Sequence, residues 1–415
     1  MKKLRDLYLS CLEQTRPLVA LPVAPAVDVR GITHTITDAL ASAGLGTHSG
    51  VARVVTETIE RALASAGLGM QGGSAESGRG ATLEGIADDI TASTSNTPDG
   101  TLIGRLVRDE PAHPGDFVTR SFSCDVGART YKLYVPASYT HTSEECVPLI
   151  VMLHGCTQDP DDFAAGTRMN ELADEHGFIV AYPAQEANAN GSKCWNWFRR
   201  QDQSRDRGEP ALIAGITREV AGRYRIDERR IFVAGLSAGA AMAVVLAATY
   251  PELYAAVGVH SGLPYACAHD VPSAFAAMKG GALGQVPLAC PADPAEGAGT
   301  GPAIPTIIFH GDHDVTVNAS NADAIVEQAR VANSDDTTAL TPTACRGTSP
   351  KGRAYTRTIL ADGTRRPVIE HWILHGAGHT WSGGSPGGSF TGPIGPDASA
   401  EMVRFFYSQH RAGRA

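Results

Sequence analysis

The segment Gly235-Leu236-Ser237-Ala238-Gly239 carries the strongest chemical signal in the sequence. It follows the apolar run 230–234 and opens an alanine-rich stretch, which is the strand–turn–helix context that a Gly-x-Ser-x-Gly motif requires. Such a turn raises the serine hydroxyl above a sheet, and its glycines let neighbouring backbone approach closely. The start of the helix also favours negative charge that develops there. The motif therefore predicts Ser237 as a nucleophile.

A serine hydroxyl is a weak nucleophile until a base, itself held by an acid, removes its proton. The apolar run 368–374 leads into His375-Gly376-Ala377-Gly378-His379, which offers two candidate bases. His379 is preferred, because it lies beyond the strand in a glycine-flanked loop that can reach the serine. His375 is more simply the end of the strand.

The candidate acids follow the apolar run 306–309, in His310-Gly311-Asp312-His313-Asp314. This site and the candidate bases both fall at carboxyl ends of expected strands, where open α/β proteins place their ligands. Asp314 is preferred, because Asp312 directly follows Gly311 and could instead fix the turn.

A tetrahedral oxyanion needs two backbone N–H donors that are already in place. One is expected from Ala238, immediately after the nucleophile. The other is expected from His154-Gly155-Cys156-Thr157-Gln158, which follows the apolar run 148–153. Cys156 N–H is preferred, with Thr157 as the alternative.

Four tryptophans, at positions 195, 197, 372 and 381, all lie in the second half of the chain. Aromatic walls beside a reactive serine suit an apolar acyl chain. We expect Trp197 and Trp381 to contact substrate. Trp195 and His154 are further candidates, with packing in the core and beneath the turn as their alternatives, and Trp372 is expected in the core.

From about residue 116 the chain alternates apolar, strand-like runs with helical stretches. Strands are expected at 117–125, 129–135, 148–153, 178–182, 230–234, 255–259, 306–309 and 368–374, and helices at 163–176, 209–223, 238–250, 319–331 and 398–410. The first two strands form an antiparallel pair that turns at Gly127. This alternation predicts an α/β domain over 116–415, with a mostly parallel sheet covered by helices on both faces.

Residues 1–115 form a separate N-terminal extension without tryptophan. The run 39–46 recurs unchanged at 62–69. Its apolar residues have helical spacing, and Gly44 and Gly67 stand where the C-caps belong, which predicts two short amphipathic helices. Residues 70–100 are rich in Gly, Ser, Thr, Ala and Asp and predict a flexible linker. The extension is either loosely ordered or a small helical hairpin packed on the catalytic domain, or it is a module of residues 33–69 that binds a polymer surface or self-associates.

The composition excludes several classes of protein. The 415 residues are 43% hydrophobic and 19% charged, which excludes a disordered chain. A net charge of −9 without basic runs disfavours nucleic acid, and no apolar stretch is long enough for a transmembrane segment. Charged residues interrupt the N-terminal apolar stretch, which slightly favours a cytoplasmic protein, whereas eight cysteines fit a secreted one. The compartment stays open.

Two cysteine pairs are plausible. A disulfide between Cys156 and Cys194 would brace the oxyanion loop against the aromatic segment. Cys267 and Cys290 bracket an insertion and form the second pair. In a reducing compartment, both pairs would be free thiols.

Together the motifs resemble the poly(3-hydroxybutyrate) depolymerase family of esterases, over about residues 116–410. The resemblance rests on the runs 154–158, 194–198, 235–239, 260–265, 310–314, 376–384 and 395–399. The family belongs to the α/β-hydrolase superfamily and is akin to feruloyl and acetylxylan esterases. The resemblance implies an α/β-hydrolase fold and a triad of Ser237, Asp314 and His379, with no metal or organic cofactor.

The function that we expect is a serine esterase acting on short-chain hydroxyalkanoate polyesters and simple esters through an acyl-enzyme. An esterase acting on carbohydrate esters, with the same mechanism, is the alternative. An inactive hydrolase fold used for binding is the alternative from another class.

Overall fold

A computed structural model describes residues 115–142, 145–281, 304–333 and 340–411. The two short helices predicted in the N-terminal extension and the linker at 70–100 lie outside the described residues. These predictions, and the binding role considered for residues 33–69, remain predictions. Cys290 lies outside them as well.

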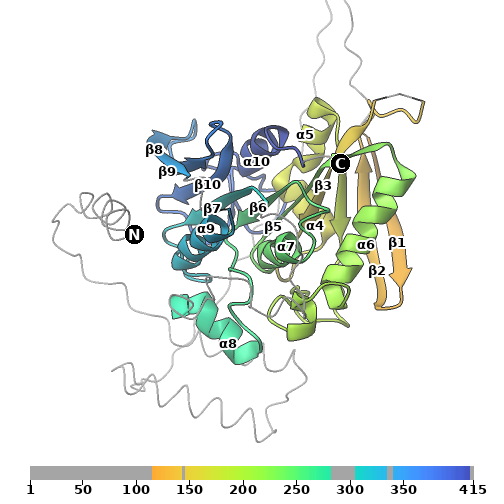
Figure 1. The fold of residues 1–415 in the computed structure, drawn as a ribbon, viewed down its shortest axis with the longest axis horizontal. Helices are drawn as coiled ribbons and strands as arrows, with labels where there is room; N and C mark the ends of the chain where they lie inside the picture. Colours follow the sequence, from red (N-terminus) through yellow and green to blue (C-terminus); the bar gives the residue numbers. More distant parts are fainter. Residues whose placement is uncertain (1–114, 143–144, 282–303, 334–339, 412–415) are drawn as a thin grey trace, which may run out of the picture. The chain divides into compact units, whose positions relative to one another are not determined.

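A ten-stranded sheet forms the centre of the described part (Figure 1). Its spatial order is β1 (Asp116–Cys124), β2 (Gly127–Val135), β4 (Ile179–Pro183), β3 (Val147–Leu153), β5 (Ile226–Leu236), β6 (Ala256–His260), β7 (Thr306–Gly311), β10 (Pro367–Leu374), β9 (Ala354–Ala361) and β8 (Thr341–Thr348). The strands from β4 to β10 pair in parallel, while β1, β2, β9 and β8 pair antiparallel at the two sides. Two short strands, β11 (Trp381–Ser382) and β12 (Thr391–Gly392), form a separate parallel pair.

Helices cover both faces of this sheet, as its continuous apolar strands require. One face packs against α6 (Gly208–Arg223), α7 (Ala238–Thr249) and α9 (Ser320–Asn333). The other packs against α4 (Pro160–Thr167), α5 (Met169–His176) and α10 (Ala398–Tyr407). Short helical segments η1 (Arg200–Gln203), α8 (Val271–Ala276) and η2 (Ala277–Gly281) lie in the connections. The predicted mostly parallel sheet with helices on both faces is confirmed.

Two of the helix predictions were wrong. The helix expected over 163–176 is broken at Arg168, whose φ of 55° ends α4 and starts α5. The guanidinium of Arg168 bonds to Asp397 Oδ2 at 2.6 Å and to the carbonyl oxygen of Gly383, so distant loops hold the break in place. The last helix ends at Tyr407, short of the expected residue 410.

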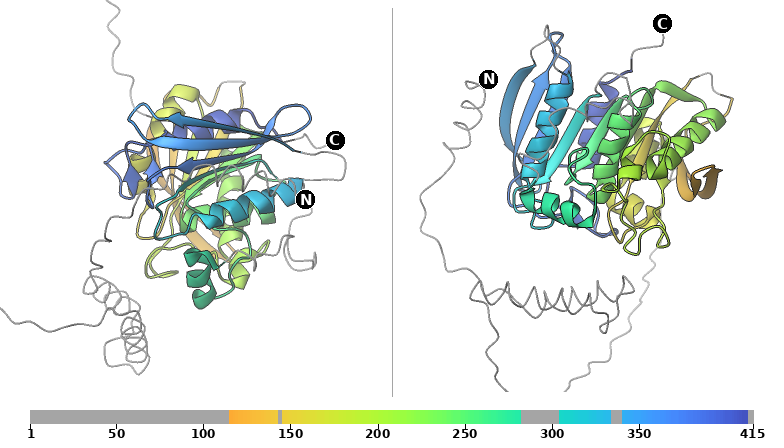
Figure 2. Two further views of the ribbon diagram at one scale, coloured as in Figure 1. Left: turned by 90° about the vertical axis from the view of Figure 1, so that its left-hand side faces the viewer. Right: turned by 60° about the horizontal axis from the view of Figure 1, so that its bottom comes forward.

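The antiparallel hairpin of β8 and β9 was not predicted. It extends the sheet beyond β10, at the side that faces the viewer in the left panel of Figure 2. Strand β8 is almost entirely exposed and carries few large apolar residues, so its sequence lacks the alternation that marks a half-buried strand.

The parallel strands β3, β5, β7 and β10 end at the same edge of the sheet. The four predicted reactive segments follow the ends of these four strands, so the topology gathers them at one edge. Among the described residues, no helix is long and apolar enough to cross a membrane.

Candidate active site

Ser237 occupies a strained turn between β5 and α7. Its φ of 57° and ψ of −119° lie in a region that non-glycine residues rarely adopt. The turn is held by the Ser237 N–H, which donates to the carbonyl oxygen of His260 at 2.9 Å. A Cβ on Gly239 would come within 2.1 Å of the Leu153 oxygen, and one on Gly235 within 2.4 Å of the Gly239 carbonyl carbon. Both glycines of the motif are therefore needed for close backbone packing.

The two preferred downstream residues, Asp314 and His379, lie in direct contact. His379 Nδ1 donates to Asp314 Oδ2 at 2.6 Å. The other carboxylate oxygen of Asp314 accepts from Thr316 N–H at 2.9 Å and from Val317 N–H at 2.8 Å. Because the carboxylate holds the proton on Nδ1, Nε2 of His379 is left as a proton acceptor.

The surroundings of Asp314 keep it ionised. Burial by itself raises the pKa of this carboxyl, but hydrogen bonds from His310 and His379 and from the Val317 N–H outweigh burial. The pKa of Asp314 is therefore held well below its usual range. A permanent negative charge beside His379 stabilises the imidazolium that forms when this residue takes a proton.

The two residues that were considered as alternatives form a pair of their own. His375 Nδ1 donates to Asp312 Oδ2 at 2.8 Å. This pair is partly exposed, with side chains 40% and 35% accessible, whereas the Asp314 side chain is fully buried beside a 12% accessible His379. The structure thus couples each histidine to a different aspartate, and burial favours Asp314 and His379 for the reaction.

The loop after β3 contains the two backbone N–H groups that were considered as oxyanion donors. Thr157 N–H donates to the carbonyl oxygen of Ser192 at 2.7 Å, which removes the alternative donor. Within the described part of the chain, Cys156 N–H donates no hydrogen bond. The second expected donor, Ala238 N–H, belongs to the first residue of α7, where no carbonyl of the same helix can accept it.

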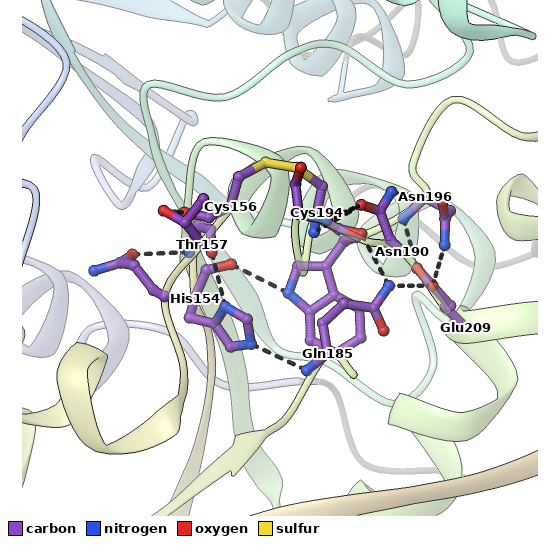
Figure 3. The surroundings of a disulfide bond; sticks show 12 residues. His154, Cys156, Thr157, Gln185, Asn190, Cys194, Asn196 and Glu209 are labelled. Atoms are coloured by element: carbon purple, nitrogen blue, oxygen red, sulfur yellow. Dashed lines mark hydrogen bonds between the residues drawn. A yellow bond between two sulfur atoms is a disulfide. The ribbon is translucent and has the colours of Figure 1, made fainter. Parts of the chain in front are cut away.

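A disulfide joins Cys156 to Cys194 and ties this loop to the segment after β4 (Figure 3). The loop is held from inside as well, because Gly155 N–H donates to Gln158 Oε1 at 2.9 Å. The position of the Cys156 N–H is thus fixed from two sides. The predicted brace between these cysteines is present in the structure.

His154 supports the loop from below. Its Nδ1 donates to the carbonyl oxygen of Gly155 at 2.8 Å, and its Nε2 accepts from Gln185 N–H at 3.0 Å (Figure 3). Burial lowers the pKa of His154 to about 4, so the ring is neutral at ordinary pH. The ring is 1% exposed, which favours packing beneath the site over contact with substrate.

The three tryptophans that were considered for contact with substrate are almost completely buried. Trp195 is 0% exposed, Trp381 1% and Trp197 6%. Trp195 Nε1 donates to the carbonyl oxygen of His154, and Trp381 Nε1 donates to Ser399 Oγ. Trp372 lies in the core, as expected. Contact of Trp195, Trp197 or Trp381 with substrate stays a prediction.

Two further residues, His260 and Glu209, support the site, although neither was predicted to have a role. The ring of His260 stacks on Trp381 and accepts from Ser382 N–H at 3.0 Å, while its carbonyl holds Ser237. Burial lowers the pKa of His260 to about 3.

Glu209 is buried and accepts hydrogen bonds from Asn196 N–H and from the side chains of Gln185 and Asn196 (Figure 3). These bonds organise the aromatic segment. The His-Ser-Gly run at 260–262 was a signal for the first; Glu209 had none.

No group of three or more His, Cys, Asp or Glu side chains in the described ranges is arranged to hold a metal ion. The chemistry that this arrangement supports is nucleophilic attack by Ser237 with proton transfer through His379.

Comparison with known proteins relates this chain to esterases. The family model described as esterase PHB depolymerase matches residues 129–346, more than half of the chain. Poly(3-hydroxyalkanoate) depolymerase C of Paucimonas lemoignei is 36% identical over 235 residues, which are 56% of this chain and 54% of that protein. Feruloyl esterase B of Neurospora crassa is 35% identical over 127 residues, 30% of this chain and 42% of that protein. The chain thus spans about half the length of these curated relatives.

Among solved structures, an acetyl xylan esterase from Aspergillus awamori aligns with a TM-score of 0.52 and 21% identity. The alignment covers 70% of this chain and 99% of that one. At this identity the likeness concerns the fold, and it confirms the predicted α/β-hydrolase fold.

Proposed function

Because the chain belongs to the esterase PHB depolymerase family, we propose that it is a serine esterase that uses Ser237, His379 and Asp314. The observation that carries this proposal is the hydrogen bond of 2.6 Å between His379 Nδ1 and the fully buried carboxylate of Asp314. Asp314 follows β7 and His379 follows β10. Both residues therefore lie at the same edge of the sheet as the strained turn that bears Ser237.

In the proposed first half-reaction, Ser237 Oγ attacks the ester carbonyl carbon while His379 Nε2 takes the hydroxyl proton. The carbonyl oxygen becomes an oxyanion, which accepts hydrogen bonds from the N–H groups of Cys156 and Ala238. Collapse of this intermediate expels the alcohol, which receives its proton from His379. Asp314 holds the correct tautomer and the charge of the imidazolium throughout.

In the second half-reaction, water gives a proton to His379 and attacks the acyl-enzyme. The same two N–H groups stabilise the second oxyanion. Its collapse releases the carboxylic acid, and Ser237 regains its proton. No step in this scheme uses a metal or an organic cofactor.

The proposed substrates are short-chain hydroxyalkanoate polyesters and simple esters. The support is the family model together with the relative named as a poly(3-hydroxyalkanoate) depolymerase, the longest alignment among the relatives described above. Esters of carbohydrates are the second candidate, because the feruloyl esterase relative matches at nearly the same identity over a shorter segment.

A hydrolysis panel tests the proposal on the full chain. We expect turnover of p-nitrophenyl acetate and butyrate and clearing of polyhydroxybutyrate films, all abolished in Ser237→Ala. Feruloyl esters and acetylated xylan, assayed beside them, distinguish the second candidate. Near wild-type turnover by the alanine variant would refute the serine mechanism, and absence of every activity in the folded wild type would favour a binding protein.

A further inference from the structure

A second carboxylate–imidazole pair, formed by Asp312 and His375, connects the loops that carry Asp314 and His379. Asp312 Oδ2 accepts from His375 Nδ1 at 2.8 Å, and Oδ1 accepts from Gly376 N–H at 2.7 Å. The carboxylate leaves the chain two residues before Asp314 and grips two residues that closely precede His379. One side chain thus ties the loop of the proposed acid to the loop of the proposed base.

The backbones of the same two loops lie directly against each other. His313 N–H donates to the carbonyl oxygen of Ala377 at 3.0 Å, and Asp312 N–H donates to that of Leu374 at 3.2 Å. A Cβ on Gly311 would lie 2.2 Å from the Ala377 oxygen, so no space separates the loops. A shift of one loop is therefore passed to the other.

The hairpin of β8 and β9 holds the outer side of His375. Thr356 Oγ1 lies 2.9 Å from His375 Nε2. Because the ring proton is on Nδ1, where it is donated to Asp312, Nε2 accepts a hydrogen bond from the Thr356 hydroxyl. The backbone N–H of His375 donates to Ala354, and Arg353 Nη1 donates to the carbonyl oxygen of His375 at 2.8 Å. His375 is thus held between the hairpin and the loop after β7.

The set of Thr356, His375 and Asp312 has the hydroxyl–imidazole–carboxylate order of a nucleophilic triad. The backbone around Thr356 argues against that use. Thr356 lies within the regular ladder of β9, paired with Arg346 and Ile373, and not at a strained turn that opens a helix. The set is built to hold a loop.

We propose that Asp312 and His375 are positioning residues that keep the His379 imidazole in register with Asp314 and Ser237. This inference rests on the proposed function, since it assigns no chemistry of its own. A displacement of about 1 Å in a catalytic group can cost on the order of 100-fold in rate. Loss of the Asp312 link should therefore reduce the chemical step more than substrate binding.

The test compares steady-state kinetics of full-length variants on p-nitrophenyl butyrate. Asp312→Ala and His375→Ala are expected to lower kcat roughly 10- to 100-fold, with KM changed by less than about threefold. His375→Asn places an amide N–H near the position of Nδ1–H and should recover most of kcat. Thr356→Val should have the smallest effect, because it leaves the link to Asp312 intact.

Asp362→Ala is the matched control. Asp362 also anchors a turn, through Thr364 N–H, Arg366 N–H and Arg366 Nε, but at the opposite end of β10. We expect a similar shift of the thermal midpoint and an unchanged kcat. Should Asp312→Ala fail to fold, the comparison of His375→Ala with His375→Asn decides the question.

Three results would overturn the inference: wild-type kcat in the folded Asp312→Ala and His375→Ala variants, equal loss of kcat in His375→Ala and His375→Asn, or fluorophosphonate labelling at Thr356. Labelling of Ser237 in wild type identifies the first two as failures of the role proposed for Asp312 and His375 alone. Failure of the proposed function would instead appear as full activity of Ser237→Ala.

Discussion

Replacing Asp314 by asparagine should remove nearly all activity while lowering the free energy of unfolding only slightly. The orientation of the new amide is dictated by the site, because the oxygen facing Thr316 N–H and Val317 N–H must remain an acceptor. The amide NH₂ must then face His379 Nδ1, which was the donor to Asp314 at 2.6 Å. His379 is forced to accept at Nδ1 and to carry its proton on Nε2, where it can no longer take the proton of Ser237.

The magnitude follows from this tautomer argument. In serine hydrolases, fixing the wrong tautomer in this way lowers kcat by roughly 10⁴-fold, on the order of 5 kcal/mol in activation free energy. Stability should change less, since both backbone N–H groups keep their acceptor. Asp314→Ala differs, because it removes the acceptor of the buried Val317 N–H, at a cost of about 1–3 kcal/mol, and that of the half-buried Thr316 N–H. It leaves His379 free to adopt either tautomer.

The assay is kcat on p-nitrophenyl butyrate beside urea unfolding of the same preparations. We expect Asp314→Asn to be more stable than Asp314→Ala and no more active, with Asp362→Asn as an unaffected control. An Asp314→Asn variant with more than about a tenth of wild-type kcat would refute the reasoning. So would an alanine variant that is both more stable and less active than the asparagine variant.

Three further predictions concern the support of the site. His154 and His260, with pKa values lowered by burial to about 4 and about 3, bind protons more weakly when folded than when unfolded. Each should therefore cost about 1.4 kcal/mol of stability per pH unit as the pH falls below about 6.5, and urea midpoints that stay constant from pH 7.5 to 5 would contradict this. Gly239→Ala forces a Cβ to within 2.1 Å of a backbone oxygen and should destabilise by about 3 kcal/mol or more, seen as a lowered melting point and lost turnover; a variant that melts like wild type would disprove the close contact. Replacing both Cys156 and Cys194 by serine opens a link across 38 residues, so unfolding should become easier by about 4 kcal/mol and kcat should fall; unchanged kcat would show that the oxyanion loop needs no brace.

Much of the central fold could be predicted because its signals are local. The apolar runs of β3, β7 and β10 are buried on both faces, so their composition alone marks them. The edge hairpin could not be predicted in this way, because β8 stabilises itself by backbone pairing while its side chains face solvent. The break at Arg168 depends on Asp397, 229 residues away, which no local window contains.

In the candidate site, too, local sequence signals could be predicted and contacts between distant residues could not. Ser237 is marked by two glycines that the close backbone packing requires, and position beyond the strand end was enough to prefer His379 over His375. The pairing of Asp312 with His375 could not be anticipated, because it depends on a lateral register between two loops. The burial of the tryptophans likewise reflects tertiary packing, which residue type does not reveal.

The most direct measurement is mass-spectrometric mapping of the residue that a fluorophosphonate probe modifies in the full-length protein. The account predicts one adduct, on Ser237, with loss of ester hydrolysis in proportion to labelling and no adduct in Ser237→Ala. An adduct on another residue, or undiminished hydrolysis by a fully labelled Ser237, would contradict it.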